Sequence, residues 1–310
     1  MPSVRPESIR TAEGFVGRAT LIGFSAVAMW ALLALFTDAS GAVPPFQLSA
    51  ICFAIGTAVG LAARAAGLAP APTQPVPRAV WIVGIAGLFG YHFLYFTALR
   101  NAPAVEASLI AYLWPLFIVL GSALMPGERL RWFHVAGALL GLAGTALIVT
   151  KGGSVAFDAR YGFGYAAALG CAFVWSGYSL LSRRFPEVPT SVVTWFCAAT
   201  AVLSLACHLL LETTVWPEGP GQWLAVAGLG LMPVGAAFYA WDYGVKHGSI
   251  QVLGAASYAA PLLSTLALIA AGFAEPGAAV LAACVLITAG AVLAAKDLLQ
   301  RRRVARAADA

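Results

Sequence analysis

The sequence predicts an all-α integral membrane protein of ten transmembrane helices, arranged as two inverted repeats of five helices each. Three observations predict this fold class: the composition, ten long apolar runs, and a match between the two halves. Of the 310 residues, 61% are hydrophobic and only 10% are charged, whereas soluble domains average about 45–50% and about 25%. So few charges exclude a water-soluble enzyme, a nucleic-acid-binding protein and a disordered protein.

Ten apolar runs are long enough to cross a bilayer. A hydrocarbon core about 30 Å thick requires about 20 apolar residues in a helix. The predicted spans are 17–37, 44–66, 79–99, 102–124, 131–150, 162–183, 189–211, 221–245, 249–273 and 276–297. Short segments rich in Pro and Gly separate them. Two GxxxG elements, at 56–60 and 137–141, are expected to be helix-packing faces.

The distribution of Lys and Arg predicts that both termini are cytoplasmic. With this orientation, 15 of the 18 basic residues fall on the cytoplasmic side, and only Arg100, Lys151 and Arg160 fall on the other. Basic residues mark cytoplasmic loops, so we expect a multi-pass protein of the inner (plasma) membrane. All five cysteines lie in apolar runs without metal-binding spacing, so we expect free thiols.

The two halves of the chain match each other at a nearly constant separation. The matched elements are Trp30 with Trp175 (145 residues apart), Tyr112-Leu113-Trp114-Pro115 with Tyr258-Ala259-Ala260-Pro261 (146), Arg100 with Lys246 (146), and Glu128 with Glu275 (147). Because each unit holds an odd number of helices, the second unit enters the membrane from the opposite side. Such inverted repeats place a binding site near the bilayer midplane and support alternating access, which favours a transporter over an enzyme.

These features resemble the EamA-type drug/metabolite transporter superfamily over about residues 17–298. The resemblance rests on Trp30 and Trp175, on the Tyr-x-x-Pro elements at 112–115 and 258–261, and on Glu128 and Glu275. It implies a first repeat at 17–150, a second at 161–298, and cytoplasmic tails at 1–16 and 299–310. His92, Tyr95, Tyr112 and Trp114 further resemble the YddG group of aromatic amino-acid exporters.

Polar and aromatic side chains in mid-span form stripes at helical spacing, and we expect them to bind substrate. They are His92, Tyr95, Tyr112, Trp114, Trp30, Trp175, Tyr178, Tyr239, Ser257 and Tyr258. Ordinary aromatic packing is the alternative for each ring, and a hydrogen bond within the bundle is the alternative for His92. Pro115 and Pro261 each remove a backbone hydrogen bond in mid-span. They are expected to kink or gate their helices beside the cavity, or else to serve packing alone.

The remaining charges are expected to be structural. Glu106 is expected to pair with Arg100 or to act as a carboxylate at a helix N-terminus. Asp242 and Lys246 have the i, i+4 spacing of an ion pair on a helix. No motif for a cofactor, a metal ion or a catalytic reaction is present, so neither cofactor nor enzymatic activity is expected.

We therefore expect an exporter of neutral, mainly aromatic or apolar amino acids. Facilitated diffusion (uniport) is favoured because the middle of the membrane lacks a pair of acidic residues for proton coupling. The alternative is a proton-coupled exporter of hydrophobic drugs or other small metabolites, and a membrane enzyme acting on lipid is a more distant one. The expected partners are the small-molecule substrate and membrane lipid, without nucleic acid, and the protein is expected to be a monomer or homodimer.

Overall fold

The computed structural model describes residues 6–270, 275, 277–297 and 299–300, and their side chains from residue 14 onward. This part of the chain is helical and contains no strand. The helices are α1 (Pro6–Trp30), α2 (Leu33–Ala39), α3 (Pro45–Ala65), α4 (Arg78–Ile85), α5 (Tyr91–Asn101), α6 (Ala104–Ala111), α7 (Trp114–Gly121), α8 (Trp132–Val149), α9 (Gly162–Ser182), α10 (Val193–Leu211), α11 (Pro220–Leu231), α12 (Ala237–His247), α13 (Ile250–Ala256), α14 (Ala259–Ala270) and α15 (Ala278–Ala294).

Several of these helices continue one another and form the predicted membrane spans. Nine helical stretches of the described chain are long and apolar enough to cross a membrane, and the tenth, α15, is apolar but shorter. The boundaries agree with the predicted runs within a few residues, with two differences. α1 begins at Pro6, inside the segment expected to be a tail. Residues 271–273, the end of the ninth predicted span, lie outside the described residues.

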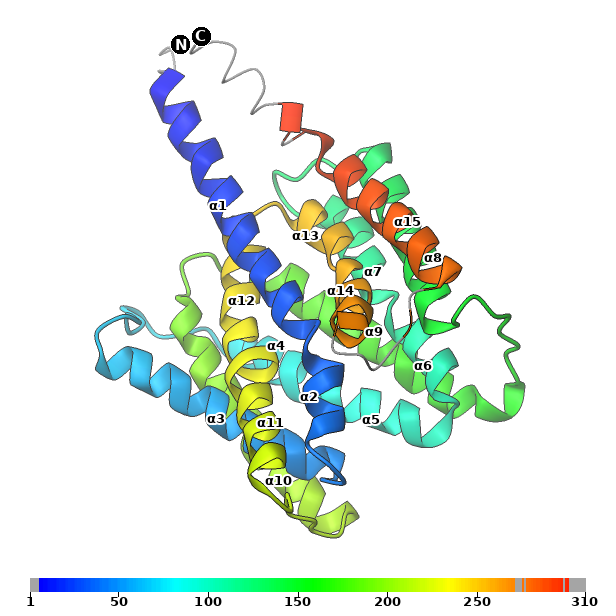
Figure 1. The fold of residues 1–310 in the computed structure, drawn as a ribbon. Coiled ribbons are helices and arrows are strands. Elements are labelled where there is room, and N and C mark those ends of the chain that lie inside the picture. The colour runs from blue at the N-terminus through cyan, green and yellow to red at the C-terminus, as the bar shows by residue number, and fades with distance from the viewer. Residues whose placement is uncertain (1–5, 271–274, 276, 298, 301–310) are drawn as a thin grey trace.

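Helix packing follows the pseudo-two-fold relation expected of inverted repeats. α1 packs along α12, and the equivalent helix of the second half, α9, packs along α5. Equivalent spans also pack against each other directly: α3 against α10, α8 against α15, and the fourth span against the ninth through α7 and α13. In Figure 1, the start of α1 and the end of α15 lie at the same end of the bundle.

Equivalent helices are also interrupted at equivalent places. A π-helical turn, Ala86–Gly90, joins α4 to α5, and a second, Met232–Ala236, joins α11 to α12, 146 residues later. The fourth span is broken between α6 and α7, just before Pro115, and the ninth between α13 and α14, just before Pro261. The break between α1 and α2 has no counterpart in α9, which is continuous.

Glycines allow close approach of the paired helices. A Cβ atom at Gly137 would lie 2.5 Å from the carbonyl oxygen of Gly290 on α15, and a Cβ at Gly56 would lie 3.2 Å from the Cα of Gly235. A Cβ at Gly141 would meet the ring of Tyr258. Both GxxxG elements therefore serve helix packing, as the sequence predicts.

Candidate functional site

Five aromatic rings meet in the centre of the bundle, and we call them the central aromatic cluster. They come from α1, α7, α9 and α12, and are Trp30, Trp114, Trp175, Phe238 and Trp241. The centroid of the Trp30 ring lies 5.1 Å from that of Trp241 and 5.6 Å from that of Trp175. Edge-to-face and offset contacts of this kind stabilise a rigid apolar layer.

The sequence did not single out two members of this cluster, Phe238 and Trp241. Both lie in a run of aromatic residues, FYAWDY at 238–243. Helical spacing cannot decide which rings of so dense a run face the interior. The sequence offered one clue to Trp241: it lies next to Asp242, a charged residue within the same helix.

Next to the central aromatic cluster lies a group of half-buried polar side chains, which we call the vestibule residues. They come from the part of α5 that follows the π-turn, from α6, and from the break after α6, and are Tyr91, His92, Tyr95, Ser108 and Tyr112. The Tyr91 and Tyr95 rings stack 6.0 Å apart, and the Tyr95 hydroxyl lies 3.3 Å from the Ser108 Oγ. Each of these five side chains is half-buried, although all of them belong to membrane-spanning helices.

Contacts to interior helices show that the vestibule residues face inward rather than toward lipid. The Tyr91 ring lies 5.5 Å from that of Trp175 on α9, and the His92 ring lies 5.1 Å from that of Phe53 on α3. His92 is also close to Phe238 of the central aromatic cluster, with 6.1 Å between ring centroids. The vestibule residues therefore border the central aromatic cluster.

Two vestibule residues retain unused hydrogen-bonding capacity. The His92 Nδ1 atom lies 2.7 Å from the carbonyl oxygen of Leu88 in the π-turn, which leaves Nε2 free for another partner. The Tyr112 hydroxyl has no hydrogen-bond partner among the described residues. Its repeat equivalent differs, because the Tyr258 hydroxyl accepts a hydrogen bond from the Leu116 N–H at 3.2 Å.

The structure places four other predicted site residues outside the vestibule. Tyr178 touches Trp175, but its hydroxyl donates to Asp242 at 3.3 Å. The Tyr239 hydroxyl lies between α3 and α10 and bonds the Gly56 carbonyl at 3.0 Å. Ser257 donates to the Leu253 carbonyl within its own helix, and Tyr258 is fully buried. The three tyrosine hydroxyls therefore join neighbouring helices in this conformation, whereas the Ser257 hydroxyl does not.

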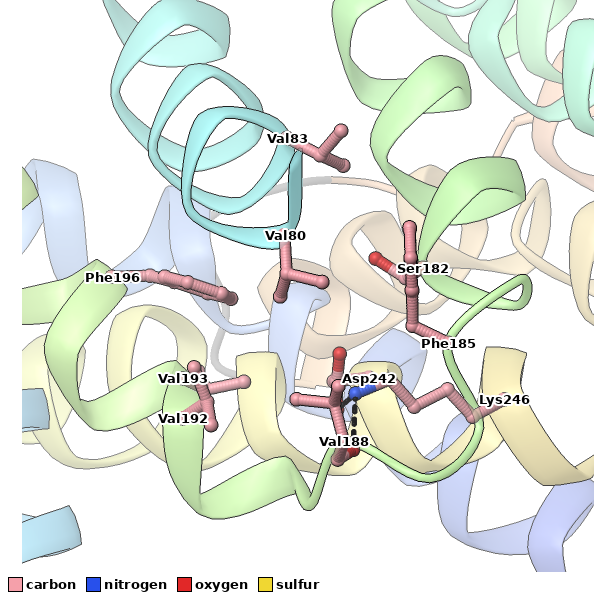
Figure 2. A pocket seen from close by; sticks show the side chains of 10 residues that line it. All are labelled: Val80, Val83, Ser182, Phe185, Val188, Val192, Val193, Phe196, Asp242 and Lys246. Atoms are coloured by element: carbon pink, nitrogen blue, oxygen red, sulfur yellow. Dashed lines mark hydrogen bonds and ion pairs between the residues drawn. The ribbon is translucent and has the colours of Figure 1, made fainter. Parts of the chain in front are cut away.

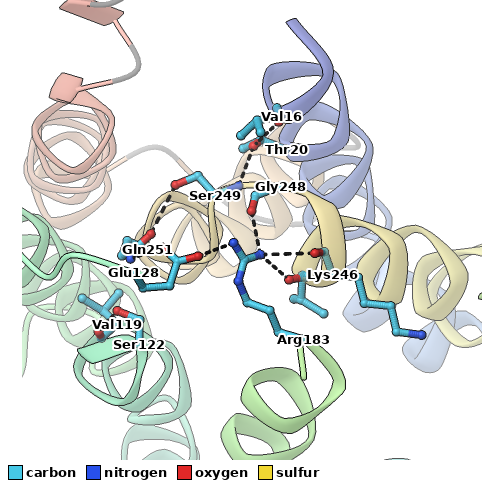
Figure 3. Close-up of polar contacts among 11 residues, drawn as sticks. Val16, Thr20, Val119, Ser122, Glu128, Arg183, Lys246, Gly248, Ser249 and Gln251 are labelled. Carbon is cyan, nitrogen blue, oxygen red and sulfur yellow. Dashed lines mark hydrogen bonds and ion pairs between the residues drawn. The ribbon is translucent and has the colours of Figure 1, made fainter. Parts of the chain in front are cut away.

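One end of the bundle is closed by a polar network that we call the Arg183 clasp. Arg183 donates to the carbonyl oxygens of Val245 and Gly248, at 2.7 and 2.8 Å, and pairs with Glu128 (Figure 3). The other carboxylate oxygen of Glu128 accepts a hydrogen bond from Gln251 at 2.8 Å. Since Glu128 belongs to the first half of the chain and the others to the second, the clasp joins the two halves.

A buried ion pair lies at the same end. The Lys246 Nζ atom is 2.8 Å from Asp242, with the two side chains 4% and 1% exposed, which confirms the predicted i, i+4 pair. Asp242 also accepts a hydrogen bond from Thr190 at 2.8 Å. The pair borders a small pocket between α4, α9, α10 and α12, whose other lining residues are Val80, Val83, Ser182, Phe185, Val188, Val192, Val193 and Phe196 (Figure 2).

At the opposite end, the carboxylate of Glu212 gathers four donors. It accepts from the backbone N–H groups of Phe46 and Gln47, both at 3.1 Å, and pairs with Arg100 at 2.8 Å and His208 at 3.0 Å. The expected pairing of Glu106 with Arg100 is wrong. Nearness in sequence suggested it, but Glu212 reaches Arg100 across the fold.

Glu106 instead takes the second role expected of it. It lies in the first turn of α6 and accepts a hydrogen bond from the Tyr165 hydroxyl of α9. No group of three or more His, Cys, Asp or Glu residues able to hold a metal ion occurs in the part of the chain that the structure describes.

Comparison with known proteins agrees with this architecture. The model of the EamA-like transporter family matches residues 17–150 and 162–296. A protein of Ancylobacter novellus named aromatic amino acid exporter YddG is 57% identical over 92% of this chain and 98% of its own length. The Escherichia coli protein of that name is 23% identical over 80% of this chain and 86% of its own. A solved crystal structure with 56% identity superposes with a TM-score of 0.85, covering 89% of this chain and 98% of the other. The chain is therefore a multi-pass membrane protein that belongs to the EamA-like transporter family.

Proposed function

We propose that this protein exports neutral, mainly aromatic or apolar amino acids across the inner membrane. The observation that carries the proposal is the vestibule, where free polar atoms border a wall of aromatic rings. The relatives named aromatic amino acid exporters support the same substrate class. The two repeats, 17–150 and 161–298, would move against each other in alternating access, and the site residues would be the vestibule residues with Trp30, Trp114 and Trp175.

The chemistry of the vestibule suits a zwitterion. An amino acid carries no net charge, so it needs hydrogen bonds for both of its poles but no full counter-charge. The His92 Nε2 atom and the hydroxyls of Tyr95 and Tyr112 supply donors and acceptors. Trp114 and Trp175, which are buried in the central aromatic cluster in this conformation, would supply flat apolar surface for the substrate side chain.

The direction in which the vestibule opens follows from the proposed topology. Tyr95 and Ser108 lie within α5 and α6, two helices whose adjoining ends lie at the Glu212 end of the bundle, where Arg100 pairs with Glu212. With cytoplasmic termini that end faces outward, and the Arg183 clasp closes the cytoplasmic end. The described conformation would then be the outward-open state, ready to release substrate.

Facilitated diffusion is the mode of transport that the charges favour. Asp242 is the buried carboxylate nearest the central aromatic cluster, and Lys246 already neutralises it. A proton-coupled exporter of hydrophobic drugs is the second candidate, since aromatic rings would accept such compounds equally well. An imposed pH gradient separates the two, because gradient-driven accumulation in proteoliposomes would exclude uniport.

Counterflow of radiolabelled amino acids in proteoliposomes tests the proposal. We expect phenylalanine, tryptophan and leucine inside the vesicles to drive uptake of label, and competition by a cationic dye to be weak. Alanine at His92, Tyr95, Tyr112 or Trp114 is expected to reduce counterflow at least tenfold. Tyr239→Phe, whose hydroxyl bonds only α3 and α10, serves as the matched control. Unchanged counterflow in all four variants would refute the site, and dye transport without amino-acid transport would refute the substrate class.

A further inference from the structure

We propose that Asp242, Lys246 and the apolar pocket beside them form a second amino-acid site, which loads substrate from the cytoplasm. This inference rests on the proposed function and adds a separate place where substrate first binds. We call it the loading site. In the described conformation its two charged groups bind each other, and in the cytoplasm-open state each would bind the opposite pole of an amino acid.

The bonding of the ion pair leaves room for such an exchange. The Asp242 carboxylate accepts from Tyr178, Thr190 and Lys246, and the Lys246 Nζ atom donates to Asp242 and to the Val188 carbonyl at 3.0 Å. Tyr178 and Thr190 would continue to donate to the Asp242 carboxylate if its bond to Lys246 were broken. Val188 would likewise keep the ammonium group in place at the mouth of the pocket.

The pocket lining is chemically complementary to an apolar amino acid, because it combines a carboxylate, an ammonium group and apolar side chains. Carboxylate and ammonium lie side by side at one wall, and Val80, Val193 and Phe196 form the opposite walls (Figure 2). A substrate ammonium on Asp242 and a substrate carboxylate on Lys246 would keep every charge paired, so the exchange would bury no uncompensated charge. The substrate side chain would enter the apolar part of the pocket.

The inverted repeat indicates how this site reaches water. Lys246 and Arg100 are repeat equivalents, each in the last turn of the helix that follows a π-turn. The Arg100 side chain, at the Glu212 end, is 43% exposed, whereas Lys246 is 4% exposed. When the halves exchange conformations, the end of α12 takes up the arrangement that the end of α5 has now. Lys246 and the adjoining pocket then become accessible from the cytoplasm.

A neutral pair tests the loading site. The double variant D242N/K246Q removes both charges while keeping side chains of similar size that can hydrogen-bond each other. Half-saturation by phenylalanine is measured separately from the cytoplasmic and outer faces in oriented proteoliposomes. We expect the cytoplasmic value to rise at least tenfold and the outer value to stay within twofold. The matched control is R131Q/D297N, which removes an ion pair at the same end with side chains 50% and 27% exposed, and should alter neither value.

The two faces respond differently only if the pair binds substrate. If the pair is instead a latch between conformations, D242N/K246Q will change half-saturation on both faces, and the proposal is overturned. Unchanged values on both faces overturn it as well. If the wild-type protein carries no amino acid in either direction, the proposed function fails and the loading site fails with it. Wild-type transport with an unchanged variant removes the loading site alone.

Single variants and truncated substrates give a second measure that does not depend on the double variant. Phenethylamine lacks the carboxylate that Lys246 would bind, so the wild-type protein should favour phenylalanine over it from the cytoplasmic face. K246Q should reduce that preference at least fivefold, and K246R, which keeps the cation, should restore it. Equal preference in K246Q and wild type would contradict the assignment of Lys246, and thermal unfolding in detergent confirms that both variants fold.

Discussion

With the proposed topology, the Arg183 clasp determines how strongly the cytoplasmic end is held closed. Glu128→Gln removes the charge of a pair whose side chains are 16% and 21% exposed. Hydrogen bonds between charged groups contribute about 1.5–3 kcal/mol when buried, and exposed ion pairs contribute about 0–1 kcal/mol. For this half-shielded pair we expect about 1 kcal/mol, which is about a fivefold shift toward the cytoplasm-open state.

Arg183→Gln should have a larger effect than Glu128→Gln. It also removes the bonds to the carbonyl oxygens of Val245 and Gly248 at the end of α12. With about 1 kcal/mol for each bond, the closed state loses about 2–3 kcal/mol, a shift of about 30- to 150-fold. The carbonyls can bind water once the end opens, so the loss falls on the closed state alone.

A cysteine at Ser182 reports this opening. Ser182 is 7% exposed and lines the pocket beside the clasp, so a membrane-impermeant thiol reagent should label S182C slowly from the cytoplasm. Labelling should accelerate about fivefold with Glu128→Gln and at least 30-fold with Arg183→Gln. The double variant E128Q/R183Q should be labelled at the same rate as Arg183→Gln alone, because Arg183→Gln already breaks the pair with Glu128. Rates within twofold of the parent in both variants would refute the reasoning.

Packing and topology give three further predictions. Gly137→Ala should lower the midpoint of thermal unfolding in detergent, because the new Cβ would lie 2.5 Å from the Gly290 carbonyl and separating α8 from α15 costs about 1–3 kcal/mol. Tyr258→Phe should lower the free energy of unfolding by about 1–3 kcal/mol, because it leaves the Leu116 N–H at the start of α7 without its partner. Cysteines at the exposed positions Gly153 and Arg184 should be labelled by an impermeant reagent from opposite faces of the membrane, outside and cytoplasmic respectively.

Each of these experiments has a direct control. Gly177→Ala meets no atom within 4 Å and should leave the midpoint unchanged or raise it, since alanine favours helix. Tyr112→Phe, the repeat equivalent of the Tyr258 change, should reduce transport without lowering the midpoint. A destabilised Gly177→Ala, or an unaffected Tyr258→Phe, would contradict the packing argument. Labelling of both introduced cysteines from the same face would contradict the topology, and with it the inverted repeat.

Features that depend on nearby residues could be predicted from the sequence. Hydropathy placed the membrane spans within a few residues, since the length of an apolar run directly reflects the bilayer thickness. The i, i+4 spacing of Asp242 and Lys246 predicted their ion pair because one helix carries both. The match between the halves predicted the inverted repeat, and the packing of α1 along α12 has its counterpart in the packing of α9 along α5.

Features that depend on tertiary packing could not be predicted. Arg100 pairs with Glu212, 112 residues away, and nothing in the local sequence distinguishes that carboxylate from Glu106. Tyr112 and Tyr258 occupy equivalent positions, yet only one of their hydroxyls is bound by the opposite helix. Equivalence in sequence cannot reveal which of two related positions faces open space, because one conformation treats the two halves differently.

The two π-turns allow the chain to lose a residue at these places without disturbing the helices around them. A π-turn contains one residue more than the α-helical path would use, so loss of a single residue within Ala86–Gly90 or Met232–Ala236 would leave the flanking helices in phase. Loss of a residue elsewhere in α11, or in α12 before Asp242, would rotate everything after it by about 100°. Asp242 and Lys246 would then turn away from their pocket, so length variation among relatives should concentrate in these two turns.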